Sequence, residues 1–243
     1  MSAAGLRRLR EKTERSLQLR GVLGTAALGA RFLWYLLVLQ TPARRAVRRR
    51  EREFDRVHSV DTSGTISPIK LEVPSPNWIH GLGFQNAPID TLRRILDGLC
   101  IRHEDFAFVD LGSGKGRALL LAADYPFRRV IGVEFAPELY HISAQNLRTY
   151  RSDTQRCFAI EAVCQDAARF VFPTEPLVLF LYNPFGPEVL KSVVANLVSS
   201  LRERPRDAFA AYMNPKHATV LDGTPSLRRH AQDRDYIIWA RCD

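Results

Sequence analysis

The sequence predicts an α/β fold, a doubly wound and mostly parallel sheet, with a basic helical extension at the N-terminus. Three observations predict it. Short apolar runs of strand length alternate with segments of helical periodicity from about residue 60 onward. A glycine-rich loop follows the first apolar run. The 243-residue chain is long enough to bury one sizeable core and still carry an extension.

The expected elements alternate along the body of the chain. Strands are expected at 106–111, 130–134, 157–163, 177–182, 208–213 and 236–241. Helices are expected at 88–99, 117–123, 137–150 and 188–201. Strands separated by helices of this length form parallel βαβ units, and such sheets bind ligands at the carboxyl ends of their strands. The candidate site therefore lies after Leu111, Glu134, Val163 and Tyr182.

The positive charge is confined to the first quarter of the chain. The sequence holds 35 Lys and Arg against 26 Asp and Glu. Residues 1–60 have a net charge of +9, and residues 61–243 have a net charge of zero. We therefore divide the chain into a basic, partly hydrophobic arm at 1–60 and a body at 61–243. A basic arm on a neutral body indicates that the arm meets an anionic partner.

Residues 21–40 are apolar over about the length that crosses a bilayer. Arg31 interrupts them, and equal numbers of basic residues flank both sides, so the charges indicate no orientation. The segment could lie in a membrane interface, span the membrane, or pack on the body as a helix. We expect residues 1–56 to meet an anionic membrane surface. Nucleic acid, bound through residues 44–52, is less favoured because Glu51 and Glu53 dilute that positive run.

The cysteines and histidines favour a reducing compartment without a metal site. The four cysteines form no CxxC pair and no disulfide framework, and the six histidines show no paired ligand spacing. We expect a cytoplasmic protein, peripheral to a membrane if the arm binds one.

The loop after the first strand reads DLGSGKG over residues 110–116. Its glycines allow sharp turns and close approach of a ligand. It is not a GxxxxGK[ST] phosphate loop, because Val109 and Gly116 stand at the first glycine and hydroxyl positions. Arg117 replaces the third glycine of a GxGxxG fingerprint, which opposes a nicotinamide oxidoreductase. Asp110 would repel a pyrophosphate but suit an ammonium group.

Glu134, at the end of the next strand, can accept hydrogen bonds from both hydroxyls of a ribose. Together, VDLGSGKGRALLLAA and VIGVE resemble the first two motifs of class I S-adenosylmethionine-dependent methyltransferases, over roughly residues 80–243. The resemblance implies a Rossmann-like sheet and S-adenosyl-L-methionine as cofactor. It implies that Asp110 lies near the methionine ammonium and that Glu134 binds the ribose. It implies that Asp166 contacts the adenine amino group. The loop residues Gly112, Ser113, Gly114 and Gly116 would lie under the cofactor.

Residues 80–86 resemble the segment that covers the methionine end of the cofactor in Dot1-like proteins. This implies that Gln85 or Asn86 binds the methionine carboxylate, with a plain loop as the alternative.

Residues 182–187 read YNPFGP at the end of the fourth strand. They resemble the Asn-Pro-Pro-Tyr/Phe motif of amino-group methyltransferases and also the Dot1-like lysine methyltransferases. Methyl transfer from a sulfonium needs a neutral nitrogen lone pair aimed at the methyl group, and positioning supplies most of the rate. Asn183 can accept the hydrogens of the amine, with Pro184 and Phe185 completing the catalytic turn. A simple Pro/Gly turn is the alternative.

These observations predict an S-adenosylmethionine-dependent N-methyltransferase acting on a protein side-chain amine of the lysine kind. The turn has one proline, Pro184, where the adenine-methylating pattern has two, and Gly186 follows Phe185. This departure disfavours a nucleic-acid amine. A nucleic-acid amino methyltransferase and a cofactor-binding module without turnover remain as alternatives.

Overall fold

The computed structural model describes residues 21–22, 24, 41–64 and 86–242. The chain divides into two compact units, Met1–Phe54 and Asp55–Asp243. The division falls before the boundary at residue 60 that the charge distribution suggests, so residues 55–60 group with the body. The helix α2, Pro42–His58, runs across it. The second unit contains the sheet.

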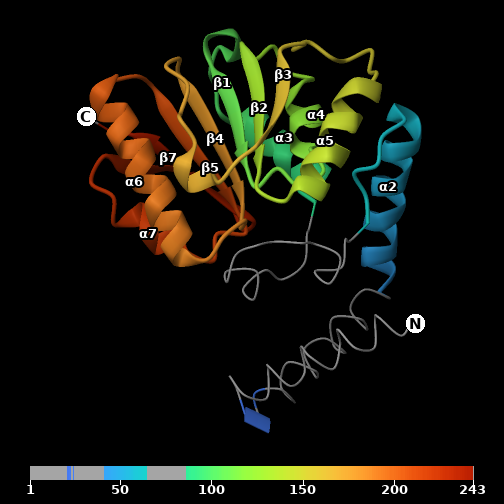
Figure 1. Ribbon diagram of the computed structural model, residues 1–243, viewed down its shortest axis with the longest axis horizontal. Helices are drawn as coiled ribbons and strands as arrows, with labels where there is room; N and C mark the ends of the chain where they lie inside the picture. Colours follow the sequence, from blue (N-terminus) through green and yellow to red (C-terminus); the bar gives the residue numbers. More distant parts are fainter. Residues whose placement is uncertain (1–20, 23, 25–40, 65–85, 243) are drawn as a thin grey trace. The chain divides into compact units, whose positions relative to one another are not determined.

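The sheet has seven strands in the order β3-β2-β1-β4-β5-β7-β6 (Figure 1). The strands are β1 Ala107–Leu111, β2 Arg129–Glu134, β3 Ile160–Cys164, β4 Leu177–Tyr182, β5 Ala208–Met213, β6 Leu227–Gln232 and β7 Tyr236–Arg241. The first five pair in parallel, whereas β7 pairs antiparallel with both β5 and β6. The strand order reverses at β1, because β2 and β3 lie on one side of it and β4 and β5 on the other. This arrangement confirms the doubly wound, mostly parallel Rossmann-like fold.

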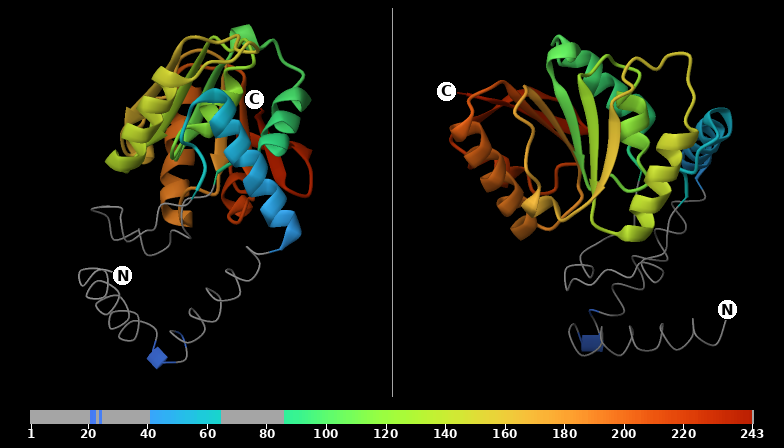
Figure 2. Two further views of the ribbon diagram at one scale, coloured as in Figure 1. Left: turned by 90° about the vertical axis from the view of Figure 1, so that its right-hand side faces the viewer. Right: turned by 45° about the horizontal axis from the view of Figure 1, so that its top comes forward.

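Helices cover both faces of the sheet (Figures 1 and 2). Those that follow α2 are α3 Ile89–Gly98, η2 His103–Asp105, α4 Arg117–Ala122, α5 Pro137–Thr149, η3 Ala167–Arg169, α6 Pro187–Glu203 and α7 Ala218–Asp222. Val109 of β1 and Leu179 of β4 join a buried cluster with Val193 and Leu197 of α6. On the opposite face, Gly132 of β2 lies against Leu119 of α4.

Every strand and helix expected from the sequence is present, with two differences in the strands. The strand expected at 157–163 begins at Ile160, where pairing with Val130 starts. The backbone N–H groups of Arg156 and Cys157 instead donate to the carbonyl of Ala123, at the end of α4. The sequence also failed to indicate β6, because its residues are mostly polar and exposed on the sheet edge.

The membrane prediction falls mainly on residues that the structure does not describe. Within the described ranges, no helix is long and apolar enough to cross a bilayer. Residues 25–40 lie outside those ranges, so the prediction for residues 21–40 stays a prediction. The basic residues 44–52 do lie on a helix, α2.

Candidate functional site

The glycine loop that follows the carboxyl end of β1 has three glycines in the left-handed backbone conformation. Gly112, Gly114 and Gly116 have φ values of 82°, 55° and 86°. A Cβ on Gly112 would come within 2.5 Å of the Pro184 Cβ atom. Only glycine suits this position, because a side chain would suffer both the backbone strain and the clash. The loop after β1 therefore packs directly on the turn after β4.

Asp110 lies on β1 with 4% of its surface exposed. Burial, with the nearby charge of Glu134, raises the pKa of Asp110 to about 8. Much of the Asp110 carboxyl is therefore protonated at neutral pH in the free protein. A cationic ligand would favour the ionised form, so this carboxyl is suited to bind an ammonium group.

Glu134 ends β2 and is almost fully buried. Its Oε2 accepts the N–H of Gly114 at 2.8 Å, and its Oε1 accepts the N–H of Ala136 at 2.8 Å. Burial raises its pKa, while these hydrogen bonds lower it. The backbone N–H of Phe135 also bonds this carboxylate, so of the about four lone-pair sites of an ionised carboxylate one remains for a ribose hydroxyl.

A small cleft opens beside the glycine loop. It is lined by Asn86, Ala87, Asp110, Gly112, Ser113, Arg117, Ala118, Phe180 and Tyr182. The hydroxyl of Ser113 is buried and has no hydrogen-bond partner among the described residues. Buried polar atoms are normally paired, so an unpaired hydroxyl beside a cleft suits a site that takes a polar ligand.

The remaining expected cofactor residues have different surroundings. Asp166 accepts the N–H of Ala168 at 2.9 Å and caps the short helix η3. The amide of Asn86 donates to the carbonyl of Thr62, and Asn86 lines the cleft. Gln85 lies outside the described residues.

The turn after β4 holds Asn183 in a left-handed conformation, with φ 45°. Asparagine tolerates this region better than most side chains. The hydroxyl of Tyr212, on β5, donates to Asn183 Oδ1 at 3.1 Å and so fixes the direction of the amide. Phe185 is half-buried and packs against the core cluster that contains α6, and the structure shows no contact between Phe185 and the cleft.

The sequence did not reveal Phe135, which follows Glu134. Its side chain is 40% exposed, one of the few exposed large apolar side chains of the described chain. An exposed aromatic ring can stack on a planar ligand, although Phe135 is not among the residues that line the cleft. Its position directly after the strand-end acid is the signal that could have indicated it.

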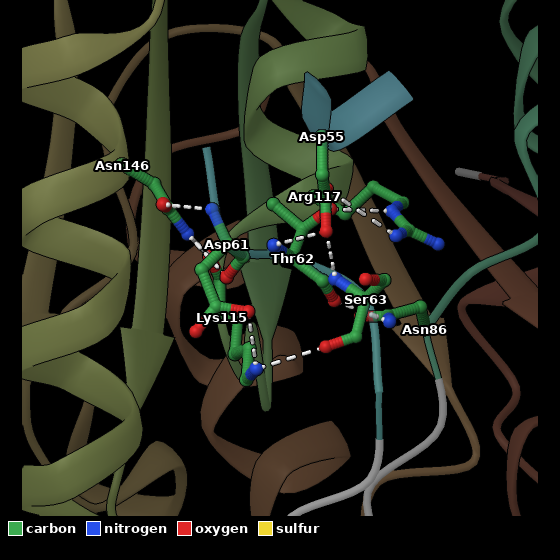
Figure 3. A network of polar contacts seen from close by, with 8 residues as sticks. All are labelled: Asp55, Asp61, Thr62, Ser63, Asn86, Lys115, Arg117 and Asn146. Carbon is green, nitrogen blue, oxygen red and sulfur yellow. Dashed lines mark hydrogen bonds and ion pairs between the residues drawn. The ribbon is translucent and has the colours of Figure 1, made fainter. Parts of the chain in front are cut away.

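The sequence also did not reveal a polar network behind the glycine loop (Figure 3). Lys115 and Arg117, both from the glycine motif, bond to residues just after α2, although both side chains are buried. No spacing in the sequence links these distant segments. No group of His, Cys, Asp or Glu suited to a metal ion occurs in the described part of the chain.

Comparison with known proteins assigns no family. No protein-family model matches the chain, and no curated protein matches it significantly. The fold is similar to that of a ribosomal protein L11 methylase from Lactobacillus delbrueckii subsp. bulgaricus, with a TM-score of 0.45 at 16% identity, over 65% of this chain and 79% of the other.

Two further solved structures share this extent of similarity. A magnesium protoporphyrin IX methyltransferase from Synechocystis PCC 6803, with bound S-adenosylmethionine, has a TM-score of 0.47 at 14% identity, over 68% of this chain and 88% of its own. An RNA methyltransferase from Salinibacter ruber has a TM-score of 0.40 at 16% identity, over 65% and 92%. At these identities the similarities assign no substrate, cofactor or site residue to this chain.

Proposed function

We propose that the protein is an S-adenosylmethionine-dependent N-methyltransferase. One observation carries the proposal: two buried carboxyl groups, those of Asp110 and Glu134, flank a glycine loop that packs against the Asn183–Pro184 turn. The carboxylates suit the ammonium and ribose of the cofactor, and the turn suits an amine. Each motif alone is a common structural feature, but their direct packing supports a cofactor site beside an acceptor site.

The residues of the site fit S-adenosylmethionine. The raised pKa of Asp110 favours a ligand that brings positive charge, whereas a pyrophosphate would add negative charge. The lone pair that the backbone N–H groups leave on the Glu134 carboxylate suits a ribose hydroxyl. The unpaired hydroxyl of Ser113 offers one more hydrogen bond, and Phe135 offers a face for adenine. Bound S-adenosylmethionine supplies a methyl group on a sulfonium, ready for in-line displacement.

Asn183 would orient the acceptor nitrogen. Because Tyr212 donates to one lone pair of the Asn183 oxygen, the second lone pair remains to accept a hydrogen of the amine. The amine must arrive neutral, and holding it in line with the methyl group is the main contribution of the protein. The site holds no metal-binding cluster within the described residues and needs none for this displacement.

The acceptor is proposed to be a protein side-chain amine of the lysine kind. The supporting feature is the single proline of the turn: Phe185 stands where adenine methyltransferases have a second proline, and Gly186 follows it. A test incubates the protein with methyl-labelled S-adenosylmethionine and a fractionated lysate. Label in protein, stable to nuclease, supports the proposal. Label in nucleic acid would favour the nucleic-acid amine, and the absence of any transfer with retained cofactor binding would favour a binding module.

Cofactor identity is tested separately by calorimetric titration. We expect S-adenosylmethionine to bind and NAD to show no binding at comparable concentrations. Tight NAD binding without any response to S-adenosylmethionine would overturn the assignment.

We further propose that the arm brings the protein to an anionic membrane surface on the cytoplasmic side. Arg45, Arg48, Arg49, Arg52 and Arg56 recur on α2 at helical spacing and share one face over a helix of about 25 Å. Near an anionic bilayer each arginine contributes about 1 kcal/mol. In flotation assays, the full chain should bind vesicles that contain phosphatidylserine and dissociate from them in high salt. It should not bind vesicles made of neutral lipids. Equal binding to both kinds of vesicle would contradict this.

A further inference from the structure

A buried polar network joins the glycine loop to a segment outside the predicted motifs (Figure 3). We call residues 55–63 the strap; they comprise the last turn of α2 and the segment after it, and all lie in the second compact unit. Asp55, Thr62, Asn146, Lys115 and Arg117 have between 0% and 8% of their surface exposed. Burying several polar side chains together is costly unless they form hydrogen bonds or ion pairs with one another.

Asp55 organises the strap. Its Oδ2 accepts the backbone N–H groups of Thr62 at 3.0 Å and Ser63 at 2.6 Å. Its Oδ1 accepts the Thr62 hydroxyl at 2.5 Å and lies 3.7 Å from Nη2 of Arg117. A buried carboxylate is costly unless it is paired in this way, so these contacts favour one conformation of the strap.

Thr62 connects the strap to the cleft. It is fully buried, and its hydroxyl oxygen accepts Nε–H of Arg117 at 2.7 Å. Its carbonyl accepts the side-chain amide of Asn86. Both Arg117 and Asn86 line the cleft beside Asp110. One residue therefore holds two cleft-lining side chains without lining the cleft itself.

Lys115 makes a second connection, from within the glycine loop. Its Nζ donates to Asp61 Oδ1 at 2.7 Å and to the carbonyl of Ser63 at 2.9 Å. Asn146 Nδ2 donates to the carbonyls of Asp61 and Lys115, each at 2.9 Å. Lys115 stands between the left-handed glycines 114 and 116, whose backbones are otherwise unusually free. The strap therefore limits the conformations of the loop.

We propose that the strap is part of the cofactor site, with Thr62 as a positioning residue that sets the affinity for S-adenosylmethionine through Asn86 and Arg117. The inference rests on the proposed function. Its physical basis is preorganisation: a loop already held in the binding conformation loses less conformational entropy when the ligand binds. Lys115, within the loop, makes its own hydrogen bonds to Asp61 and Ser63 of the strap.

The test compares Thr62→Val with Thr62→Ser. Serine keeps the hydroxyl, whereas valine keeps the shape and loses both side-chain hydrogen bonds. Calorimetric titration should show the Kd for S-adenosylmethionine rising about tenfold in Thr62→Val and staying within about twofold of wild type in Thr62→Ser. The number of binding sites per folded chain should stay unchanged, because the cofactor site would be weakened and not lost.

A second variant keeps the inference testable if Thr62→Val fails to fold. Lys115→Met removes the ammonium group and keeps the aliphatic part of the side chain. Because two hydrogen bonds to the strap are lost, we expect the Kd to rise several-fold. The matched control is Lys191→Met, because Lys191 forms an exposed ion pair with Glu188 at 3.0 Å on α6. Its Kd should not change.

The outcomes separate the two proposals. If wild type does not bind S-adenosylmethionine, the proposed function fails. If wild type binds and the variants that fold keep its Kd, the strap has no role in affinity and the inference fails. A lowered number of sites with an unchanged Kd would show a role in folding alone and would also overturn it.

Discussion

The two halves of the candidate site are built differently. In the cofactor half, Asp110 and Glu134 are nearly inaccessible, and three left-handed glycines shape the loop between them. In the acceptor half, the turn at residues 182–186 is half-buried, and a single hydrogen bond from Tyr212 orients Asn183. A buried loop whose backbone turns only glycine accommodates admits few ligands, whereas a half-exposed turn can face many acceptors. The structure therefore constrains the cofactor more tightly than the substrate.

The sharpest test of this contrast is Asn183→Ala. If Asn183 orients the amine, turnover at saturating cofactor should fall about 10²- to 10³-fold, as when one oriented polar group is lost from an active site. The Kd for S-adenosylmethionine, measured by calorimetry, should change less than twofold.

Asn183→Gly is the matched control, because glycine accepts the left-handed backbone without strain. It should lose as much turnover as alanine while keeping more stability. Full activity in Asn183→Gly would show that only the backbone turn matters.

Glu134→Gln should act on the other half and lower cofactor affinity about 100-fold, as expected for lost hydrogen bonds to a charged group. Both carboxylate oxygens accept backbone N–H groups, so the amide nitrogen of glutamine would face another donor. Calorimetric titration measures the change in Kd. Glu161→Gln, on the exposed part of β3, is the control and should bind as wild type does. If Glu134→Gln raises the Kd by less than threefold, the proposal that Glu134 binds the ribose is wrong.

Cofactor affinity should depend on pH through Asp110. Below about pH 8 this carboxyl is protonated in the free protein, and an ammonium ligand binds best to the ionised form. Affinity should therefore rise between pH 6 and 8 by at most about tenfold per pH unit. Methylthioadenosine, which has no ammonium group, should show no such rise, and Asp110→Asn should abolish it for the cofactor.

The same pKa has a consequence for stability, with a defined sign. The pKa of Asp110 is higher in the folded chain than in the unfolded one, so the stability it contributes is complete at low pH and is lost as the pH rises toward 8. Thermal unfolding of the ligand-free protein should show Asp110→Asn gaining stability over wild type on going from pH 5 to 8. An unchanged difference would contradict the burial of this carboxyl.

The smallest effect is expected for Tyr212→Phe. It removes one neutral hydrogen bond to Asn183, which is worth about 0.5–1.5 kcal/mol and corresponds to a loss of turnover of roughly two- to tenfold. The half-buried Tyr236 on β7 offers the control variant Tyr236→Phe. Equal turnover in Tyr212→Phe and wild type would mean that Asn183 needs no orienting partner.

The parts of the fold predicted best are those with a local signal. The strands β4, β5 and β7 have the boundaries that their apolar runs indicate. β6 lacked such a signal because polar residues suffice at an exposed edge. The start of β3 was misplaced because its apolar run includes Cys157, whose backbone pairs with the end of α4. Apolar character reports burial, and it does not report which backbone a residue pairs with.

The sequence by itself determined the sheet class, the glycine loop and the two strand-end acids, because each depends on residue types close together in the chain. Only the tertiary structure decided that Gly112 packs on Pro184, that Tyr212 orients Asn183, and that Thr62 holds two side chains of the cleft. These contacts join segments far apart in sequence. Their energies arise from burial and geometry that exist only once the sheet has brought those segments together.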